Sequence, residues 1–170
     1  MASVLEISLS VHKEAETILK KTDVINYLKP FGNIRIAGSY YTELMYNPDI
    51  DLAVVSANPR QSALEFLQLM IGKKLFQKCE YGDFELFPIA NRPKSQIVVL
   101  VLPYKGKRWE IEIWFVKEFD KKQLIFEEQL KRLPQNIKAE IIQRKIDRER
   151  SGLDKKALSS YQIYQNYVAI

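Results

Sequence analysis

The strongest constraint on the fold of this chain is a pair of apolar segments separated by a tight turn. Residues 96–102 read QIVVLVL and residues 108–116 read RWEIEIWFV, with Lys-Gly-Lys at 105–107 between them. β-Branched and aromatic residues favour strands, and a glycine in a short polar connection favours a hairpin. Side chains alternate along a strand, so Glu110 and Glu112 share one face and the isoleucines share the other. The sequence therefore predicts a β-hairpin whose second strand carries two acids on one face.

The remaining segments add helices and further strands to this hairpin. The apolar spacing predicts strands over 33–37, 49–55 and 80–88, and helices over 11–28, 39–45, 58–72, 121–133, 136–150 and 159–168. This order favours an α+β fold, with a mixed sheet of about 4–6 strands and helices packed on it. We expect a catalytic domain over residues 1–120 and a helical extension over 121–170, packed on the same core as one compact domain.

A second pair of acids begins the strand expected over 49–55. Asp49 and Asp51 flank a single apolar residue, Ile50, so both carboxylates point to the same face of that strand. Neighbouring carboxylates repel each other unless a cation neutralises them. Mg²⁺ prefers hard oxygen ligands and often completes its shell with phosphate oxygens. The pattern indicates metal-dependent chemistry at a phosphate; the alternative is a solvated turn that leads into a strand.

The scarcity of histidine and cysteine narrows the possible chemistry. The chain has one histidine, His12, and one cysteine, Cys79. A single cysteine excludes an internal disulfide and a thiolate zinc cluster, and a Ser-His or Cys-His nucleophilic site would have to use His12. The net charge of +5 is compatible with nucleotides, RNA or other anions. Carboxylate and metal chemistry is therefore the expectation.

The order of these features resembles a known group of enzymes. An apolar strand leads into Gly38-Ser39, a short helix follows, Asp49 and Asp51 begin the next strand, and a later hairpin supplies another acid. This arrangement resembles the DNA polymerase beta-like nucleotidyltransferase superfamily. The resemblance covers about residues 24–116 and is most specific at IRIAGS and DIDLAVV. It implies a nucleotidyltransferase-like palm followed by C-terminal helices.

The string WEIEIWFV is similar to the strand that carries the third acid in poly(A) polymerases of this superfamily. That similarity assigns the third acid to Glu112 rather than Glu110. The resemblance implies that Asp49, Asp51 and Glu112 hold two Mg²⁺ or Mn²⁺ ions. A nucleoside monophosphate is then transferred from a nucleoside triphosphate (NTP) to an acceptor hydroxyl, and Glu112 could also act as the general base.

The resemblance also assigns a phosphate-binding role to the Gly-Ser pair. Gly38 lets the backbone approach the triphosphate, and the Ser39 hydroxyl adds a donor. Two positions depart from the usual pattern of the superfamily. The third acid, Glu112, is an aspartate in most members, and the second glycine that many members carry is absent, because Thr42 and Glu43 stand there.

Other acids compete for these roles. Asp83 and Glu85 form a further alternating pair and could supply the third ligand, or they could be solvated. Glu110 and Glu112 could also be solvated side chains on the solvent-exposed face of an edge strand.

Three functions remain open at this point. The first is a nucleotidyltransferase, the second is a catalytically silent module of the same fold that binds a nucleotide or a partner, and the third is a protein that binds RNA or modifies RNA ends. At 170 residues the chain favours a small molecule or a protein side chain as acceptor, with RNA possible but less favoured. We find no signal peptide and no apolar run of the ~18 residues that span a membrane, so we expect a cytoplasmic monomer or homodimer without a membrane partner.

Overall fold

The computed structural model describes residues 3–88, 94–152 and 158–168, and the chain divides into two compact units. Ala15–Ala37 and Pro48–Phe119 form the first, which we call the sheet unit. Met1–Glu14, Gly38–Asn47 and Asp120–Ile170 form the second, which we call the helical unit. The helical unit thus combines the expected C-terminal extension with two earlier segments of the chain.

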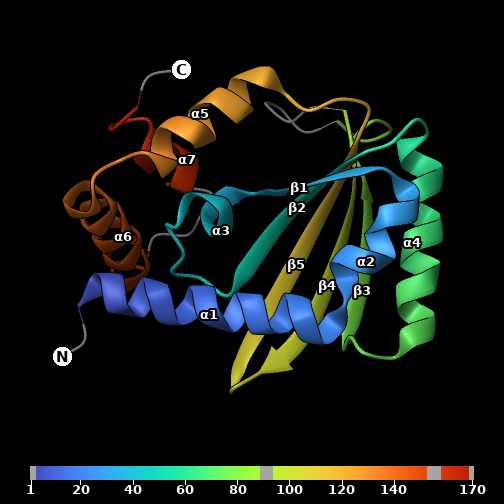
Figure 1. The fold of residues 1–170 in the computed structure, drawn as a ribbon, viewed down its shortest axis with the longest axis horizontal. Coiled ribbons are helices and arrows are strands. Elements are labelled where there is room, and N and C mark those ends of the chain that lie inside the picture. The colour runs from blue at the N-terminus through green and yellow to red at the C-terminus, as the bar shows by residue number, and fades with distance from the viewer. Residues whose placement is uncertain (1–2, 89–93, 153–157, 169–170) are drawn as a thin grey trace. The chain divides into compact units, whose positions relative to one another are not determined.

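The sheet unit contains a mixed sheet of five strands. These are β1 (Asn33–Ala37), β2 (Asp49–Val55), β3 (Lys78–Asp83), β4 (Gln96–Tyr104) and β5 (Lys107–Val116). Their order is β1-β2-β5-β4-β3 (Figure 1). Strands β2 and β5 pair in parallel, and the other neighbours pair antiparallel. The expected α+β fold with a mixed sheet is confirmed.

The predicted hairpin is formed by β4 and β5. Only Lys105 and Gly106 connect them, with φ values of 48° and 72°. Two consecutive residues with positive φ are characteristic of a type I′ turn, whose twist matches that of the flanking strands. The turn fixes the register in which Tyr104 faces Lys107 and Val99 faces Glu112.

One face of the sheet forms the core of this unit. The side chains of Ile50, Leu52, Ile111 and Ile113 are fully buried. Helix α4 (Pro59–Lys73) packs across β3, β4 and β5 on this face, as the contact between the rings of Phe66 and Phe115, 5.9 Å apart, indicates. We call this side of the sheet the core face and the other side the acid face.

The first predicted helix has different limits in the structure. A capping box at Ser3 and Glu6 begins α1 (Val4–Thr22) seven residues earlier than expected. The helix then stops at Asp23, whose φ of 55° lies in the left-handed region, and α2 (Val24–Leu28) and the 3₁₀ turn η1 (Lys29–Phe31) follow. Within the residues that the model describes, no helix has both the length and the apolar character needed to cross a membrane.

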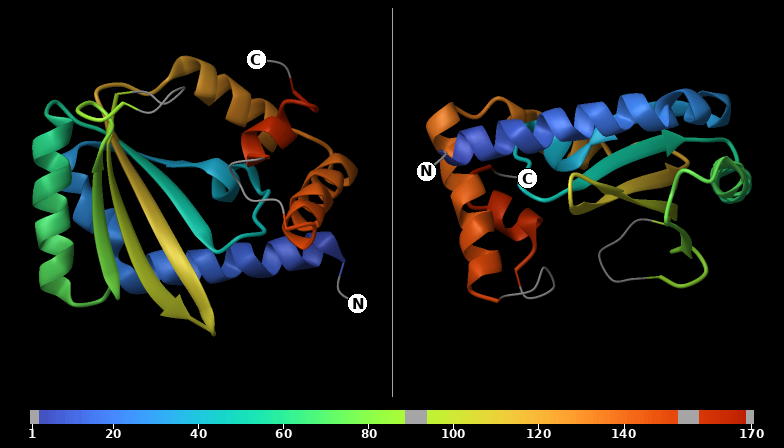
Figure 2. Two further views of the ribbon diagram at one scale, coloured as in Figure 1. Left: turned by 180° about the vertical axis from the view of Figure 1, so that it is seen from behind. Right: turned by 90° about the horizontal axis from the view of Figure 1, so that it is seen from below.

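The helical unit has its own core. Helices α3 (Gly38–Thr42), α5 (Lys121–Lys131), α6 (Gln135–Arg150) and α7 (Ser160–Tyr164) belong to it. α6 and α7 lie side by side (Figure 2), and α3 packs on α5. The buried side chains of this core are Leu44, Phe126, Leu130, Ile141, Ile142, Ile146, Ile163 and Tyr164.

Two buried lysines of α6 hold the segment that follows α3. The Lys138 ammonium lies 2.7 Å from the Glu43 carboxylate, and this hydrogen bond holds the pKa of Glu43 below its usual value. The Lys145 ammonium donates to the Leu44 carbonyl at 2.7 Å. A buried ammonium needs such acceptors, because burial without them costs several kcal/mol. These contacts fix the chain just beyond α3.

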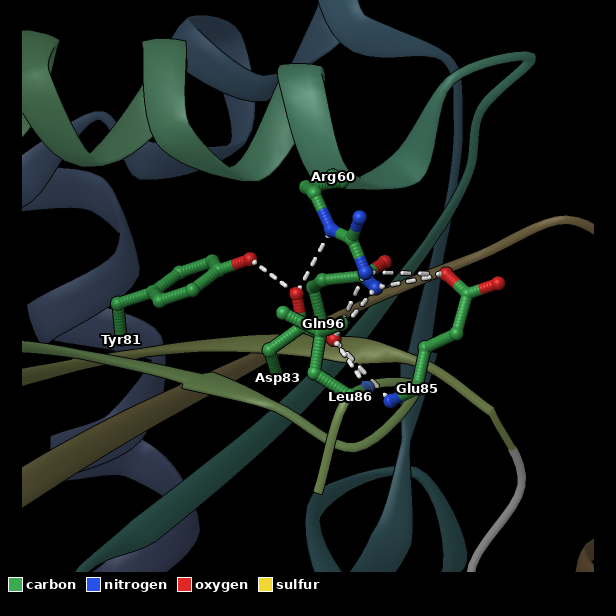
Figure 3. Close-up of polar contacts among 6 residues, drawn as sticks. All are labelled: Arg60, Tyr81, Asp83, Glu85, Leu86 and Gln96. Atoms are coloured by element: carbon green, nitrogen blue, oxygen red, sulfur yellow. Dashed lines mark hydrogen bonds and ion pairs between the residues drawn. The ribbon is translucent and has the colours of Figure 1, made fainter. Parts of the chain in front are cut away.

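The end of β3 is held in place by one buried carboxylate, that of Asp83. Its donors are the side chains of Arg60, Tyr81 and Gln96 and the backbone amides of Glu85 and Leu86, at 2.8–3.4 Å (Figure 3). The two amide bonds turn the backbone, as aspartate side chains commonly do. The strand expected over 80–88 was therefore wrong in its limits, because β3 ends at Asp83.

These contacts shift the pKa values of Asp83 and of one of its donors, Tyr81. Burial alone would raise the pKa of Asp83, but hydrogen bonds from Arg60, Gln96 and the Leu86 amide outweigh it and hold the pKa well below the usual aspartate value. Burial, together with the hydrogen bond to this carboxylate, raises the pKa of Tyr81 to about 12. Asp83 is therefore a charged anchor of the sheet unit at neutral pH.

We predict that Asp83→Asn lowers the free energy of unfolding by about 2 kcal/mol, because the buried Asp83 carboxylate loses its charge-assisted hydrogen bonds, although the Arg60 side chain itself is 41% exposed. Urea denaturation followed by circular dichroism measures this change. Glu85→Gln is the matched control, since its half-exposed carboxylate lies 3.5 Å from the same guanidinium and should contribute no more than about 1 kcal/mol.

The effect of Asp83→Asn should depend on pH. Because the folded protein lowers the pKa of Asp83, its contribution is fully present above the unfolded pKa of about 4 and is lost as pH falls below that value. The stability difference between the native protein and the variant should therefore shrink from pH 5 towards pH 2. An unchanged difference across this range would contradict the role of the charge.

Candidate acid site

The candidate site is built on the central parallel pair, β2 and β5. In their register Asp49 faces Glu110 and Asp51 faces Glu112. Residues that face each other across neighbouring strands share one side of the sheet, so all four carboxylates lie on the acid face. They are half-buried, whereas the alternating residues between them are fully buried on the core face. The structure thus places Asp49, Asp51 and Glu112, the three acids that the sequence singles out, on one face of the sheet.

The two glutamates of β5 have different surroundings. Glu110 forms an ion pair with Arg108, two residues earlier on the same face, and lies opposite Asp49 at the start of the parallel pairing. Glu112 lies one step further into the sheet, opposite Asp51 on one side and Val99 on the other. Glu110 is therefore part of a surface ion pair, and Glu112 is the glutamate that lies beside Asp51.

The donors on this face match a divalent metal in kind. Carboxylate oxygens are the ligands that Mg²⁺ and Mn²⁺ prefer. Over residues 3–88, 94–152 and 158–168, however, no three His, Cys, Asp or Glu side chains are gathered closely enough to hold a metal ion. Carboxylates repel one another without a cation between them, which opposes such gathering. The acid face therefore offers the right donors on a shared face, without a preformed cage.

The competing acid pair lies elsewhere. Asp83 faces Gln96, which in turn faces Phe115 on the core face, so its carboxylate is on the opposite side of the sheet from Glu112. Its oxygens accept five donors, and Glu85 pairs with Arg60. Asp83 and Glu85 thus both have structural partners. Their alternating pattern in the sequence could not distinguish this role from that of a metal ligand.

Gly38 and Ser39 begin α3 in the helical unit. Gly38 has a φ of 63°, a left-handed conformation that costs other residues about 1–2 kcal/mol. The glycine is therefore needed for the backbone itself, as well as for any approach of a phosphate. Ser39 is buried, and its carbonyl accepts the Leu44 amide.

The backbone amide of Gly38 has an anionic partner within the protein. It donates to the carboxylate of Glu127 on α5 at 3.0 Å, and Glu127 is 5% exposed. This contact could not be read from the sequence, because a glutamate in a charged helix such as KKQLIFEEQLK usually faces solvent. The amide of Gly38 thus already has an anionic acceptor within the protein.

No protein-family model and no curated protein matches the chain. Solved structures do match. The Cid1 poly(U) polymerase, whose structure contains Mg and 3′-dATP, aligns with a TM-score of 0.61 at 19% identity over 82% of this chain and 42% of that one.

Two further structures give the same result. A cytoplasmic RNA terminal U-transferase aligns with a TM-score of 0.62 at 20% identity, over 89% of this chain and 45% of that one. The non-canonical poly(A) polymerase in the GLD-2–GLD-3 complex aligns with a TM-score of 0.61 at 14% identity, over 96% of this chain and 57% of that one. This chain thus spans about half the length of the chains it matches. It has the fold of the DNA polymerase beta-like nucleotidyltransferases, the superfamily that its sequence pattern resembles.

Proposed function

We propose that this chain takes part in metal-dependent nucleotidyl transfer, in which a nucleoside monophosphate moves from an NTP to an acceptor hydroxyl. The observation that supports the proposal is the register of β2 and β5, which puts Asp49, Asp51 and Glu112 on one face of a nucleotidyltransferase fold. A structural role does not require three acids there, because like charges on facing strands destabilise a sheet.

Each acid has a defined role in this proposal. Asp49, Asp51 and Glu112 would hold Mg²⁺ or Mn²⁺, which neutralises charge on the phosphates and lowers the pKa of the acceptor hydroxyl. Glu112 accepts the proton of that hydroxyl. The acceptor oxygen forms a bond to the α-phosphorus of the NTP, the bond from that phosphorus to the bridging oxygen breaks, and pyrophosphate leaves.

Gly38 and Ser39 are proposed to bind the triphosphate. The Gly38 amide already binds an anionic group, the Glu127 carboxylate. A phosphate oxygen at the same amide would have to take the place of that carboxylate. The Ser39 hydroxyl would add one hydrogen bond, and a bond to a charged group contributes about 1.5–3 kcal/mol at most.

The acceptor that we propose is the terminal hydroxyl of an RNA strand. The three aligned structures are described as a poly(U) polymerase, an RNA terminal U-transferase and a poly(A) polymerase. The net charge of +5 suits a polyanionic acceptor. The direct test is incubation of the protein with each α-labelled NTP, Mg²⁺ or Mn²⁺ and a single-stranded RNA oligonucleotide, followed by separation of extended strands.

The first prediction of this proposal is that Asp51→Asn abolishes transfer and leaves the fold intact, because the variant removes a bridging ligand. The thermal midpoint should stay the same or rise slightly, since one repelling carboxylate is lost. Glu80→Gln is the matched control, because Glu80 lies on the same face and faces Val99, the neighbour of Glu112. Full transfer activity in Asp51→Asn would exclude its role as a ligand.

The second prediction separates the two glutamates of β5. Glu112→Gln should lower the transfer rate by at least 100-fold, because the side chain serves as ligand and base. Glu110→Gln should change the rate less than threefold, because Glu110 pairs with Arg108. Rates measured at saturating Mg²⁺ and NTP decide between them, and the reverse pattern would assign the third ligand to Glu110.

The third prediction concerns the triphosphate. Ser39→Ala should weaken binding of a non-hydrolysable NTP with Mg²⁺, by ~0.5–1.5 kcal/mol for one lost hydrogen bond, or by up to about 3 kcal/mol where the hydroxyl contacts a charged phosphate oxygen. Titration calorimetry measures the change in Kd. Ser39→Ala is a better test than Gly38→Val, because a valine at a φ of 63° would itself destabilise the fold. An unchanged Kd would make this segment a structural turn.

A further inference from the structure

A tryptophan lies beside the acids on the same face of the sheet. Trp114 follows Glu112 by two residues on β5, so the two side chains share the acid face, about 7 Å apart along the strand. Trp114 is half-buried, whereas the other tryptophan of the chain, Trp109, is fully buried on the core face. An amphipathic indole at the edge of an acidic site suits ligand contact better than core packing.

A second aromatic ring extends this surface. The ring of Phe84 stacks on that of Trp114, with centroids 5.6 Å apart and an interplanar angle of 23°. Gly82 lies close to this ring: a Cβ there would be 2.9 Å from the Ile97 side chain, and 3.9 Å, an ordinary contact distance, from the tip of the Phe84 ring. Phe84 directly follows Asp83, whose contacts with the Glu85 and Leu86 amides hold the backbone of this turn (Figure 3).

The row of residues that contains Trp114 combines an aromatic ring with a cation. Across the sheet Trp114 faces Ala53 on β2, and Ala53 faces Arg35 on β1. The side chain of Ala53 is a single methyl group, so it does not form a barrier between the indole of Trp114 and the side chain of Arg35. Two strand spacings separate Arg35 from Trp114, about 10 Å. The acid face thus carries a stacking ring and a guanidinium in one row, next to Asp51 and Glu112.

We propose that Trp114 and Phe84 form a stacking surface for the terminal base of a single-stranded nucleic acid acceptor, with Arg35 close to its backbone phosphate. This inference rests on the proposed function and names the acceptor of that site. Base stacking on aromatic side chains tolerates any sequence, and arginine is the usual partner of backbone phosphates.

The acceptor, rather than the NTP, is assigned to this surface because of Glu112. In the proposed reaction Glu112 takes the proton of the acceptor hydroxyl, so the acceptor's last nucleotide must lie over β5. Trp114 is the next residue of β5 on that face. The NTP is assigned to the metal ions and to Gly38 and Ser39.

The two tryptophans allow a direct test by intrinsic fluorescence. A 12-nucleotide single-stranded RNA, added without divalent metal, should quench the emission saturably. Trp114→Phe should abolish the quenching and Trp109→Phe should retain it, because Trp109 is fully buried. The same RNA in duplex form should quench much less. Equal quenching in Trp114→Phe, or quenching by ATP but not by RNA, would overturn the assignment.

A second measurement follows the RNA instead of the protein, so it does not depend on tryptophan emission. Anisotropy of a fluorescein-labelled copy of this RNA should show a Kd raised about 5- to 100-fold in Trp114→Leu and in Phe84→Leu. The Kd of a non-hydrolysable NTP with Mg²⁺ should be unchanged in both. Unaltered RNA affinity in both folded variants would overturn the proposal.

RNA binding and nucleotide transfer, measured side by side, distinguish the stacking surface from the proposed transferase. Asp51→Asn should still bind the RNA and quench, while it transfers no nucleotide. RNA binding through Trp114 without transfer by the native protein would refute the transferase and leave the stacking surface. Transfer whose KM for RNA is the same in Trp114→Leu would refute the stacking surface and leave the transferase.

Discussion

The parallel pairing of β2 with β5 is the constraint on which the rest of the sheet unit depends. Parallel strands need a long connection, and here the chain passes through α4, β3 and β4 before β5 returns beside β2. Because facing residues share a side, the pairing places two acids of each strand together and keeps their isoleucine neighbours in the core. The hydrophobic free energy of that core therefore holds the like charges together on the opposite face of the same two strands.

The carboxylates of the sheet unit fall into two environments. Asp83 lies on the core face, and its donors compensate its burial, so it acts as a fixed structural anion. Asp49, Asp51 and Glu112 lie on the acid face, where the register sets Asp49 opposite Glu110 and Asp51 opposite Glu112. Burial with donors favours stability, whereas clustered acids cost stability until a cation binds. The same residue types thus serve opposite purposes on the two sides of one sheet.

Much of this arrangement could be predicted from alternation and turn chemistry. The alternation in WEIEIWFV predicted that Glu110 and Glu112 share one face, and the Lys-Gly sequence predicted the hairpin turn. Both predictions depend only on residues that are neighbours in the chain. The end of β3 could not be predicted, because it depends on Arg60, 23 positions from Asp83 in the chain. The contact between Gly38 and Glu127 escaped prediction for the same reason, with 89 positions between its partners. The roles of the acids as metal ligands stay predictions.

The two-residue turn between β4 and β5 has a consequence for how this sequence can vary. It ties the count of residues along β5 to the face on which each one lies. One residue inserted within β5 before Glu112 would move an isoleucine into its place beside Asp51 and push acids into the core; two residues would not. The site is therefore sensitive to whether strand length changes by an odd or an even number. In relatives of this chain, the number of residues between the turn and the acid opposite Asp51 should therefore stay even or odd as it is here, even where the other side chains of β5 differ.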